Sequence, residues 1–328
     1  MKKNIAVVGC GHWGKNLVRN FSDLGSLAAV CDPNAEVAQQ YADQYLVKNY
    51  SFSEVLNDLS IEGVVLAVPA PLHASMAIEV MNAGKHAYVE KPLAMNNLEA
   101  DRMIASAEEN GVQLMVGHLL QYHPIFMALR TLVESGEMGA LQYIYSNRLS
   151  FGKVRSEEDV IWSFAPHDIS MILSLTGHEP DSVRTEYTSI LQPDIADAAI
   201  VHMEFSSGLK AHISVSWLHP YKEQKLVVVG KNAMAVFDDT KPWGEKLALY
   251  RHVVRSSGSL PSLEKAEVEY VEVSQSEPLR NECQHFVDVV SGDVTPLTNG
   301  KEGLGVLNVL SAASLSQSKN QAVRIESL

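Results

Sequence analysis

Three glycines and one aspartate have the types and the spacing that bind a dinucleotide. Gly9, Gly11 and Gly14 form a G-x-G-x-x-G pattern between an apolar run and an amphipathic run. Such glycines allow a tight turn and a close approach of pyrophosphate to the backbone, and the following helix N-terminus favours phosphate. Asp32 ends the next apolar run, where a carboxylate accepts ribose hydroxyls and repels a 2′-phosphate. The pattern predicts NAD rather than NADP; the alternative is a Rossmann-like domain with an empty site.

A charged pair, Glu90–Lys91, is the second chemical feature, because it follows an apolar run and runs into Pro92. Charges at the end of a buried strand cost free energy unless a partner compensates them. From the residues alone, a structural ion pair explains Lys91 as well as a functional ammonium does.

The elements that must position these residues alternate between strand and helix over the first part of the chain. Apolar runs at 4–10, 27–32, 62–69, 86–92 and 113–119 predict strands, and amphipathic runs at 14–25, from 33, at 71–84 and at 96–111 predict helices. Strands that are apolar throughout and separated by helices indicate a parallel sheet covered on both faces. We therefore expect an α/β fold with a doubly wound Rossmann domain over 1–121.

The alternation of strands and helices ends after residue 122, where strand-like runs follow one another directly. Residues 141–151 alternate with period two, and 198–217 predict a hairpin across 206–208. Helices are expected at 124–136, 166–176, 279–291 and 302–317, the third of them structural, and a surface loop at 255–265. The pattern predicts a C-terminal α+β domain over 122–328, built on an open, mostly antiparallel sheet.

The composition of the chain limits the kinds of molecule that it can bind. The chain has 328 residues, a formal net charge of −13 and no run of the roughly 20 apolar residues that a membrane helix needs. An acidic chain is a poor partner for nucleic acid. The apolar run at the start is too brief for a secretory signal, and the residues show no metal-site spacing. Three cysteines indicate a reducing cytoplasm; we interpret Cys10 and Cys31 as small buried residues rather than a redox pair.

Four stretches resemble the glucose–fructose oxidoreductase/inositol dehydrogenase (Gfo/Idh/MocA) family over essentially the full chain. They are GCGHWG, VPAPLHASMAIEVMNAGKHAYVEKPLAM, GHLLQYHP and APHDISMILSLTG. In that family the lysine of Glu-Lys-Pro lies beside the nicotinamide and takes part in catalysis, and a histidine on a helix of the second domain is the acid/base group. The resemblance implies that Lys91 and His167 are the catalytic residues.

Elementary chemistry agrees with this implication. Oxidation of a secondary alcohol needs a hydride acceptor, a group that takes the hydroxyl proton, and a positive group near the developing alkoxide. NAD supplies the first, and His167 and Lys91 the others. Pro166 suits the first turn of a helix, so we expect His167 near a helix N-terminus, neutral and able to accept a proton. The residues do not choose between the two as the base, and a capping or core histidine is the alternative for His167.

The resemblance also implies the coenzyme contacts and shows two departures. Family members often carry an acid where this chain has Ser163, and an arginine where it has Gln121. The first departure leaves the orientation of His167 open, and the second indicates that a substrate contact has changed. The residues implied to bind NAD are Gly9, Gly11, His12, Trp13, Gly14, Asp32, Pro69, His73, Glu90 and His118.

The stretch 147–168 resembles the UDP-N-acetylglucosamine 3-dehydrogenases of this family. That resemblance implies NAD-dependent oxidation of the 3-hydroxyl of a UDP-linked amino sugar, for lipopolysaccharide or surface-glycan synthesis. Clustered basic residues can bind a diphosphate, although they can also pair with the acidic residues 157–159 in a solvated loop. Aromatic residues can pack on sugar or uracil, although core packing is their commoner role. The expected substrate residues are Arg148, Lys153, Arg155, Trp162, Ser163, Tyr122 and His123.

Two other functions stay open. One is a dehydrogenase or ketoreductase for another sugar, an inositol or a UDP-sugar uronic acid, since the fold does not choose among these. The other is a non-catalytic dinucleotide-binding regulator. Because an open sheet leaves one face uncovered, and the family packs such sheets across a two-fold axis, we also expect a homodimer or tetramer.

Overall fold

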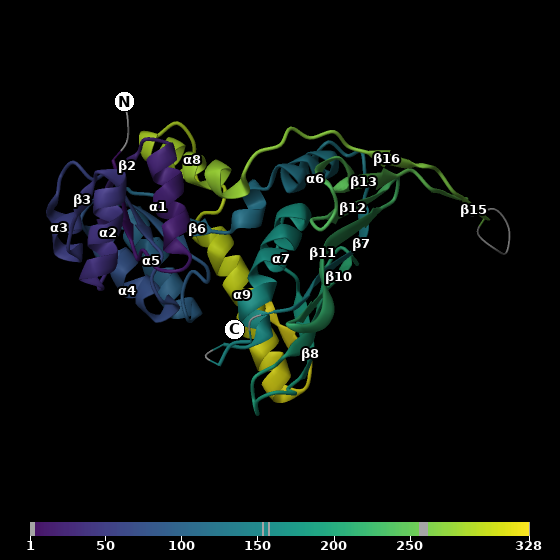
Figure 1. Ribbon diagram of the computed structural model, residues 1–328. Coiled ribbons are helices and arrows are strands. Elements are labelled where there is room, and N and C mark those ends of the chain that lie inside the picture. Colours follow the sequence, from purple (N-terminus) through teal and green to yellow (C-terminus); the bar gives the residue numbers. More distant parts are fainter. Residues whose placement is uncertain (1–3, 153, 157, 256–261, 328) are drawn as a thin grey trace. The chain divides into compact units, whose positions relative to one another are not determined.

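The chain forms two compact units in this computed structural model, which describes residues 4–152, 154–156, 158–255 and 262–327 (Figure 1). The first unit contains residues 1–123 and 276–307, and the second contains 124–275 and 308–328. No helix in the described part of the chain is both long and apolar enough to span a membrane.

A six-stranded parallel sheet forms the centre of the first unit, as predicted. Its order is β3-β2-β1-β4-β5-β6. From β1 the chain adds strands toward one edge of the sheet as far as β3, and it then adds β4, β5 and β6 on the other side of β1. Residues of β1, β4 and β6 are buried throughout, which is the burial expected of parallel strands covered on both faces. The strands are β1 Ile5–Val8, β2 Leu27–Cys31, β3 Lys48–Asn49, β4 Gly63–Leu66, β5 His86–Glu90 and β6 Leu114–Gly117.

Helices cover this sheet and confirm the alternating pattern. The predicted helices are all present, but the short β3 and α3 were not predicted, because two polar residues and six-residue helices leave little periodic signal. The helices of the unit are α1 Gly14–Asp23, α2 Ala35–Tyr45, α3 Phe52–Asn57, α4 His73–Asn82, α5 Asn97–Asn110, α8 Pro278–Ser291 and the first part of α9 Gly300–Lys319.

The segment 276–307 differs from the predicted division of the chain after residue 121. Helix α8 packs in the first unit, where the Phe286 ring meets Phe21 and Tyr88 edge-on at 6.2 and 5.6 Å between centroids. Leu279, Cys283 and Val290 complete its apolar face within the same buried cluster as β1 and α1. The sequence of an amphipathic helix indicates that its apolar face packs on another surface, but it does not indicate which domain provides that surface.

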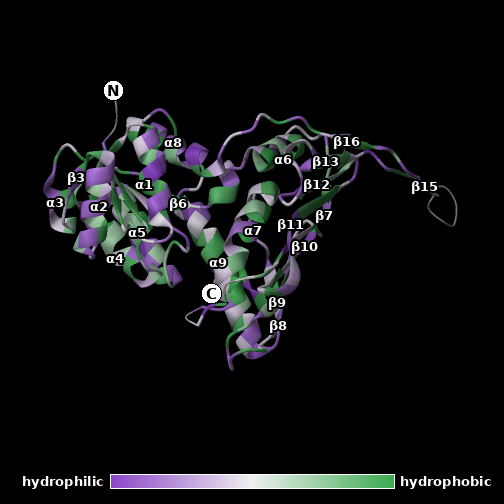
Figure 2. Cartoon of the chain, in the orientation of Figure 1, coloured by the Kyte–Doolittle hydropathy of each residue, from purple (hydrophilic) through white to green (hydrophobic). Residues whose placement is uncertain are grey.

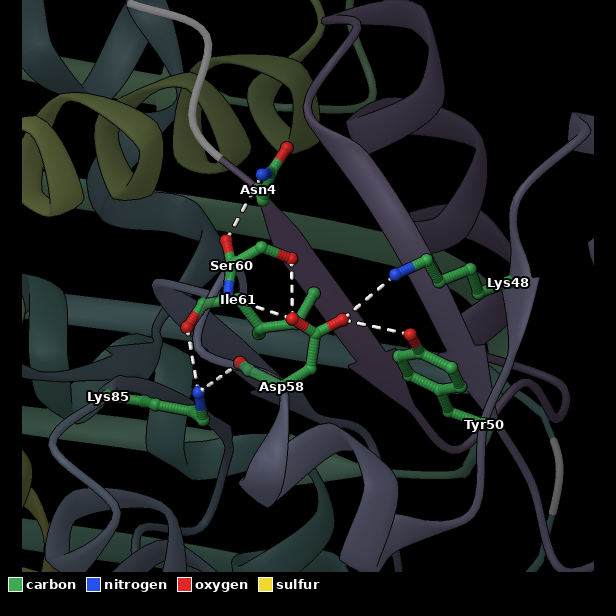
Figure 3. Close-up of polar contacts among 7 residues, drawn as sticks. All are labelled: Asn4, Lys48, Tyr50, Asp58, Ser60, Ile61 and Lys85. Carbon is green, nitrogen blue, oxygen red and sulfur yellow. Dashed lines mark hydrogen bonds and ion pairs between the residues drawn. The ribbon is translucent and has the colours of Figure 1, made fainter.

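The amino ends of the strands are joined by a polar cluster around Asp58 and Lys85 (Figure 3). The Lys85 ammonium is 3% exposed and donates to the carbonyls of Asp58 at 2.7 Å and Ile61 at 2.9 Å. The Asp58 carboxylate accepts from Ser60, Lys48 and Tyr50, and these bonds hold the pKa of Asp58 well below its usual range. The cluster fixes the edge of the sheet that lies opposite the glycine-rich turn.

A nine-stranded sheet dominates the second unit, in the order β16-β13-β12-β11-β7-β10-β9-β8-β17. Every neighbouring pair is antiparallel except β7 with β10, which confirms the prediction of a mostly antiparallel sheet. The strands are β7 Leu141–Phe151, β8 Ser182–Thr188, β9 Ala198–Glu204, β10 Lys210–Ser216, β11 Leu218–Gly230, β12 Met234–Asp238, β13 Leu247–Tyr250, β16 Val268–Tyr270 and β17 Val323–Arg324.

Two further short strands, β14 Val253–Arg255 and β15 Ser262–Glu264, pair with each other. The surface loop predicted at 255–265 lies largely outside the described residues. The predicted hairpin is present, because β9 and β10 pair with Glu204 opposite Lys210 across the turn.

Helices α6 Pro124–Glu134 and α7 Val160–Thr176 lie along one face of this sheet (Figure 1). Figure 2 shows many hydrophobic residues in α7, in keeping with its largely buried surface. Helix α9 lies on the same side, since Trp162 Nε1 donates to Ser314 Oγ at 3.0 Å. Figure 1 shows no helix on the opposite face of this sheet among the described residues of the unit.

Helix α7 begins earlier than predicted, which corrects the placement of His167. The Asp159 side chain caps the helix by accepting from the backbone amides of Ile161 at 2.9 Å and Trp162 at 3.0 Å. Pro166 therefore lies inside the helix rather than in its first turn. A proline there forfeits one backbone hydrogen bond, and the long buried surface of the helix offsets that cost. His167 lies more than one turn from the N-terminus, beyond the first turn in which the helix dipole acts.

Candidate active site

The turn between β1 and α1 requires its glycines for steric reasons. Gly9 has φ +91°, and a Cβ on it would lie 2.4 Å from the Ala67 carbonyl oxygen. A Cβ on Gly14 would lie 1.8 Å from the Gly9 carbonyl oxygen, so neither position accepts a side chain. A Cβ on Gly11 would meet nothing within 4 Å, which leaves open space above the turn. A backbone turn of this shape at a helix N-terminus can approach a pyrophosphate closely.

Asp32 lies just beyond β2, at the same edge of the sheet. Its Oδ2 accepts from the Cys10 amide at 2.7 Å and its Oδ1 accepts from the Asn34 amide at 2.9 Å. These bonds fix the carboxylate beside the glycine-rich turn, with further lone pairs on both oxygens for ribose hydroxyls.

Cys10 and Cys31 are free and buried, as predicted. Burial and the nearby Asp32 charge raise the pKa of Cys10 to about 12 and that of Cys31 to about 11. Thiols with such values stay protonated at neutral pH and are poor nucleophiles, which supports a packing role rather than a redox role.

The end of β5 is tied directly to the glycine-rich turn. Glu90 Oε1 accepts a hydrogen bond from Trp13 Nε1 at 2.6 Å and another from the Tyr88 hydroxyl at 3.3 Å. Burial raises the pKa of Glu90, while the Trp13 bond and the positive charge of Lys91 oppose that effect. Lys91 thus has a charged neighbour in Glu90. The Lys91 ammonium can interact with the Glu90 carboxylate and still serve as a catalytic group.

A second carboxyl group, that of Glu282 on α8, lies in the interior close to Glu90. Glu282 is 1% exposed, and among the described residues neither of its oxygens has a hydrogen bond of normal geometry. Burial, followed by the negative charge of Glu90, raises its pKa well above the usual value, and the Tyr88 phenol acts in the opposite direction. Sequence reasoning missed this group, although a glutamate among apolar residues such as Leu279, Cys283 and Phe286 was a signal.

Of the other residues implied to bind NAD, Pro69 is exposed just beyond β4, at the same edge as the glycine-rich turn. His12 and Trp13 lie within the turn itself. His73 and His118 are buried; His118 Nδ1 lies 2.6 Å from Glu302 Oε2 on α9, and the His73 ring lies between two backbone carbonyls.

Tyr122 and His123, expected near the substrate, are buried in the first unit. The Tyr122 hydroxyl is hydrogen bonded to Thr298 Oγ1 at 2.9 Å, and the ring belongs to the apolar cluster around β1. Burial raises the pKa of the Tyr122 phenol well above its usual value. In this structure the ring has a core role, which was the alternative weighed for aromatic residues.

His167 lies in the second unit, on α7, where it is half-buried. The next residue, Asp168, is 1% exposed and forms the centre of a buried charged network. Arg148 on β7 donates to it from Nε at 2.5 Å and from Nη2 at 3.3 Å, and Ser146 Oγ donates at 2.5 Å. Two donor nitrogens of Arg148 thus bind Asp168, and the network fixes α7 to the central strand of the sheet.

The other expected substrate residues of this unit lie around the start of α7. Arg155 is exposed and pairs with Glu158 at 3.0 Å, and its carbonyl accepts from Gln192 Nε2 at 3.1 Å. Trp162 is half-buried and Ser163 is buried. Lys153 lies outside the described residues. The described residues do not group three or more histidine, cysteine, aspartate or glutamate side chains in a way that could hold a metal ion.

Comparison with known proteins gives two family matches. Residues 3–118 match the profile described as an oxidoreductase family with an NAD-binding Rossmann fold. Residues 126–236 match the profile described as the GFO/IDH/MocA C-terminal domain.

Similar individual proteins include two dehydrogenases. The UDP-N-acetylglucosamine 3-dehydrogenase of Acidithiobacillus ferrooxidans is 28% identical over 302 residues, which cover 92% of this chain and 93% of that protein. A solved structure of that enzyme has a TM-score of 0.84 and covers 95% of this chain and 96% of its own. The inositol 2-dehydrogenase of Salmonella typhimurium is 26% identical over 226 residues, or 66% of this chain and 67% of that protein.

The residues at the carboxyl edge of the parallel sheet fit NAD. Gly11 leaves space for a pyrophosphate, α1 presents its N-terminus to it, and Asp32 offers a carboxylate but no cation for a 2′-phosphate. Glu90, tied to Trp13, brings the residue after β5 next to the same turn.

Proposed function

Because the chain belongs to the GFO/IDH/MocA family of NAD-binding oxidoreductases, we propose that it oxidises the 3-hydroxyl of UDP-N-acetylglucosamine to the 3-keto form. The observation that carries this proposal is the match over 92% of the chain to an enzyme of that activity. The product is a keto sugar nucleotide, which an aminotransferase would consume during lipopolysaccharide or surface-glycan synthesis. The reducing cytoplasm is the compartment that fits such a pathway.

When bound, NAD accepts the hydride from the carbinol carbon. In the proposed mechanism Lys91 and His167 are the acid/base and electrostatic groups for the hydroxyl of that carbon. One of them takes the hydroxyl proton, and the ammonium of Lys91 stabilises the developing alkoxide. Burial raises the pKa of Glu90, and the Trp13 bond and the positive charge of Lys91 act in the opposite direction and favour its carboxylate form.

The basic residues near the start of α7 are proposed to bind the diphosphate of the substrate. Arg155 is exposed and its ion pair with Glu158 is a weak surface pair, so a diphosphate can displace it. The role of Lys153 is proposed from the sequence alone. Arg148 is proposed to act through its network with Asp168, since two of its donor nitrogens are bound there.

A second enzyme function, oxidation of an inositol or a free sugar, is favoured by the 26% identical inositol 2-dehydrogenase. That match covers 66% of the chain, against 92% for the nucleotide-sugar enzyme. A non-catalytic regulator predicts the loss of Lys91 or His167, and both are present.

Association is proposed to occur through the uncovered face of the nine-stranded sheet. On this face Tyr145 stacks on His212, and the Tyr143 ring lies tilted against both. The Tyr143 hydroxyl is hydrogen bonded to His212 Nδ1 at 2.6 Å. Ile200 is 39% exposed on the neighbouring strand. An exposed apolar and aromatic sheet face favours a two-fold dimer or a tetramer of this chain.

The test of the proposed activity is a panel of substrates. The purified protein is incubated with NAD and, separately, UDP-sugars, free hexoses and inositols, and NADH is followed by its absorbance. We expect turnover with UDP-N-acetylglucosamine and a 3-keto product by mass spectrometry. Turnover with an inositol alone would move the assignment to the second function.

A further inference from the structure

His73 begins α4 and lies in the interior of the first unit, 1% exposed. Its two ring nitrogens face two backbone carbonyls: Nδ1 lies 2.7 Å from Pro92 O, and Nε2 lies 2.9 Å from Val68 O. Pro92 follows Lys91 directly, and Val68 follows β4. We infer that His73 is a positioning residue that sets the placement of Lys91 relative to the glycine-rich turn.

The Val68 side of this contact leads back to the glycine-rich turn. Val68 is adjacent to Ala67, whose carbonyl oxygen would lie 2.4 Å from a Cβ on Gly9. The Ala67 amide also donates to the Val8 carbonyl at 2.8 Å, at the end of β1. The loop after β4 is therefore fixed against the glycine-rich turn, and His73 transmits that position to Pro92.

The residue on the other side of Lys91 is tied to the same turn. Glu90 accepts from Trp13 Nε1 at 2.6 Å, and Trp13 lies between Gly11 and Gly14. Both chain neighbours of Lys91 are thus connected to the turn that fits the pyrophosphate, one directly and one through His73. A reactive group needs such a frame, because a displacement of about 1 Å can lower turnover about 10²-fold.

The protonation state of the ring sets how many of the two carbonyls it binds. A neutral imidazole has one N–H, so it donates to one of the two carbonyls, whereas an imidazolium donates to both. The pKa of His73 is lowered from its usual value, chiefly by burial and also by the positive charge of Lys91. The two carbonyls act in the opposite direction but do not cancel this effect. His73 is close enough to Lys91 for their charges to interact, and no ring nitrogen remains to bind a coenzyme.

Three substitutions separate positioning from packing and from coenzyme binding. In His73→Asn the amide nitrogen can replace Nδ1 and keep the contact with Pro92, whereas His73→Gln can replace Nε2 and keep the contact with Val68. His73→Phe keeps a ring of similar size and removes both contacts. The matched control is His285→Phe, because His285 on α8 is half-buried in the same unit and accepts from the Leu297 amide at 3.0 Å.

We expect His73→Phe to lower kcat by up to about 10²-fold while NAD affinity, measured by calorimetry, stays that of the wild type. His73→Asn should retain more activity than His73→Gln, because the Pro92 contact is the one next to Lys91. A kcat equal to that of the wild type in His73→Phe would overturn the inference, and so would an equal loss in NAD affinity. If His73→Phe does not fold, the activities of the other two variants decide. An activity of His73→Gln equal to or above that of His73→Asn would reject the inference.

The inference rests on the proposed role of Lys91, so one readout must not depend on turnover. With ¹³C-labelled lysine, the NMR signal of Lys91 is assigned by its loss in Lys91→Arg. We expect that signal to shift in His73→Phe and to stay in place in His285→Phe. An unmoved signal would overturn the positioning role, whereas a shifted signal without turnover on any UDP-sugar would overturn only the proposed substrate.

Discussion

At the residue scale, the end of β5 concentrates the chemistry of the first unit. Glu90 accepts from Trp13 and Tyr88, Lys91 follows it, and the carboxyl group of Glu282 lies buried nearby. Two carboxyl groups in one interior cannot both ionise without a large cost. The geometry therefore assigns the negative charge to Glu90, which has donors and the Lys91 ammonium, and the proton to Glu282.

The first prediction concerns Lys91. Lys91→Ala is expected to lower turnover by about 10²–10⁴-fold, the range of a lost acid/base or electrostatic group, with NAD affinity largely intact. Lys48→Ala is the control, because Lys48 is an exposed lysine of the same unit that pairs with Asp58. Turnover near the wild-type rate in Lys91→Ala would reject its assignment.

The second prediction concerns the protonation of Glu282. A carboxyl group whose pKa is raised in the folded state stabilises the protein fully below the unfolded pKa, near 4.5, and that contribution is lost as the pH rises. Gln resembles the protonated form and does not titrate. Relative to wild type, Glu282→Gln should therefore gain free energy of unfolding as the pH rises above 4.5, by at most about 1.4 kcal/mol per pH unit.

Denaturant unfolding of both proteins between pH 4.5 and 8 measures this difference, in which the other titrating groups largely cancel. A difference that does not change with pH would show that Glu282 titrates alike in both states, and it would remove Glu282 from the buried carboxyl pair.

The third prediction concerns Asp32. Asp32→Asn keeps an acceptor oxygen for the Cys10 or Asn34 amide but removes the charge that repels a 2′-phosphate. We expect weaker NAD binding and a narrower preference for NAD over NADP, both measured by calorimetry. If neither value changes, Asp32 does not contact the coenzyme.

At the element scale, α7 carries His167, and its start is set by Asp159. Asp159→Ala removes a side-chain N-cap and should cost about 1 kcal/mol of stability. Because the capped turn lies less than three turns from His167, we also expect a lower kcat/KM. Asn96→Ala is the control, since Asn96 caps α5 in the first unit by accepting from the Glu99 amide at 3.0 Å. Equal kcat/KM in the two variants would show that the start of α7 does not position His167.

The elements differ in how far the sequence predicted them. The strand–turn–helix around Gly9, Gly11 and Gly14 was predicted because steric demands leave few residues that fit. The start of α7 was not, because Pro166 suits a first turn and the Asp159 cap lies among other acidic residues. The partner of α8 was also not predicted, since periodicity identifies an apolar face but not the surface that covers it.

Candidate site residues follow the same rule. The roles of the glycines and of Asp32 could be predicted because they depend on residues close to them in the sequence. The partners of Arg148, His73 and Glu282 lie far away in the sequence: Asp168 is 20 positions from Arg148, Pro92 is 19 from His73, and Glu90 is 192 from Glu282. Such contacts arise only when the tertiary fold brings the elements together.

At the scale of the whole molecule, the uncovered sheet face predicts self-association. We expect light scattering to give a dimer or tetramer mass for the wild type. Tyr145→Glu places a charge among Tyr143 and His212 and should lower the mass toward that of a monomer. Leu59→Glu, at a 94% exposed residue of the first unit, should leave the mass unchanged. A monomeric wild type, or a Tyr145→Glu variant with the wild-type mass, would contradict this interface.

In the proposed reaction, NAD bound to the first unit receives a hydride from C3 of a nucleotide-linked amino sugar. The direct measurement uses UDP-N-acetylglucosamine deuterated at C3, with NAD and the wild-type protein, followed by mass spectrometry of the reduced coenzyme. We expect the deuterium to be found in the NADH and the sugar to be recovered as its 3-keto form. Formation of unlabelled NADH, or no NADH from this substrate while an inositol is oxidised, would contradict it.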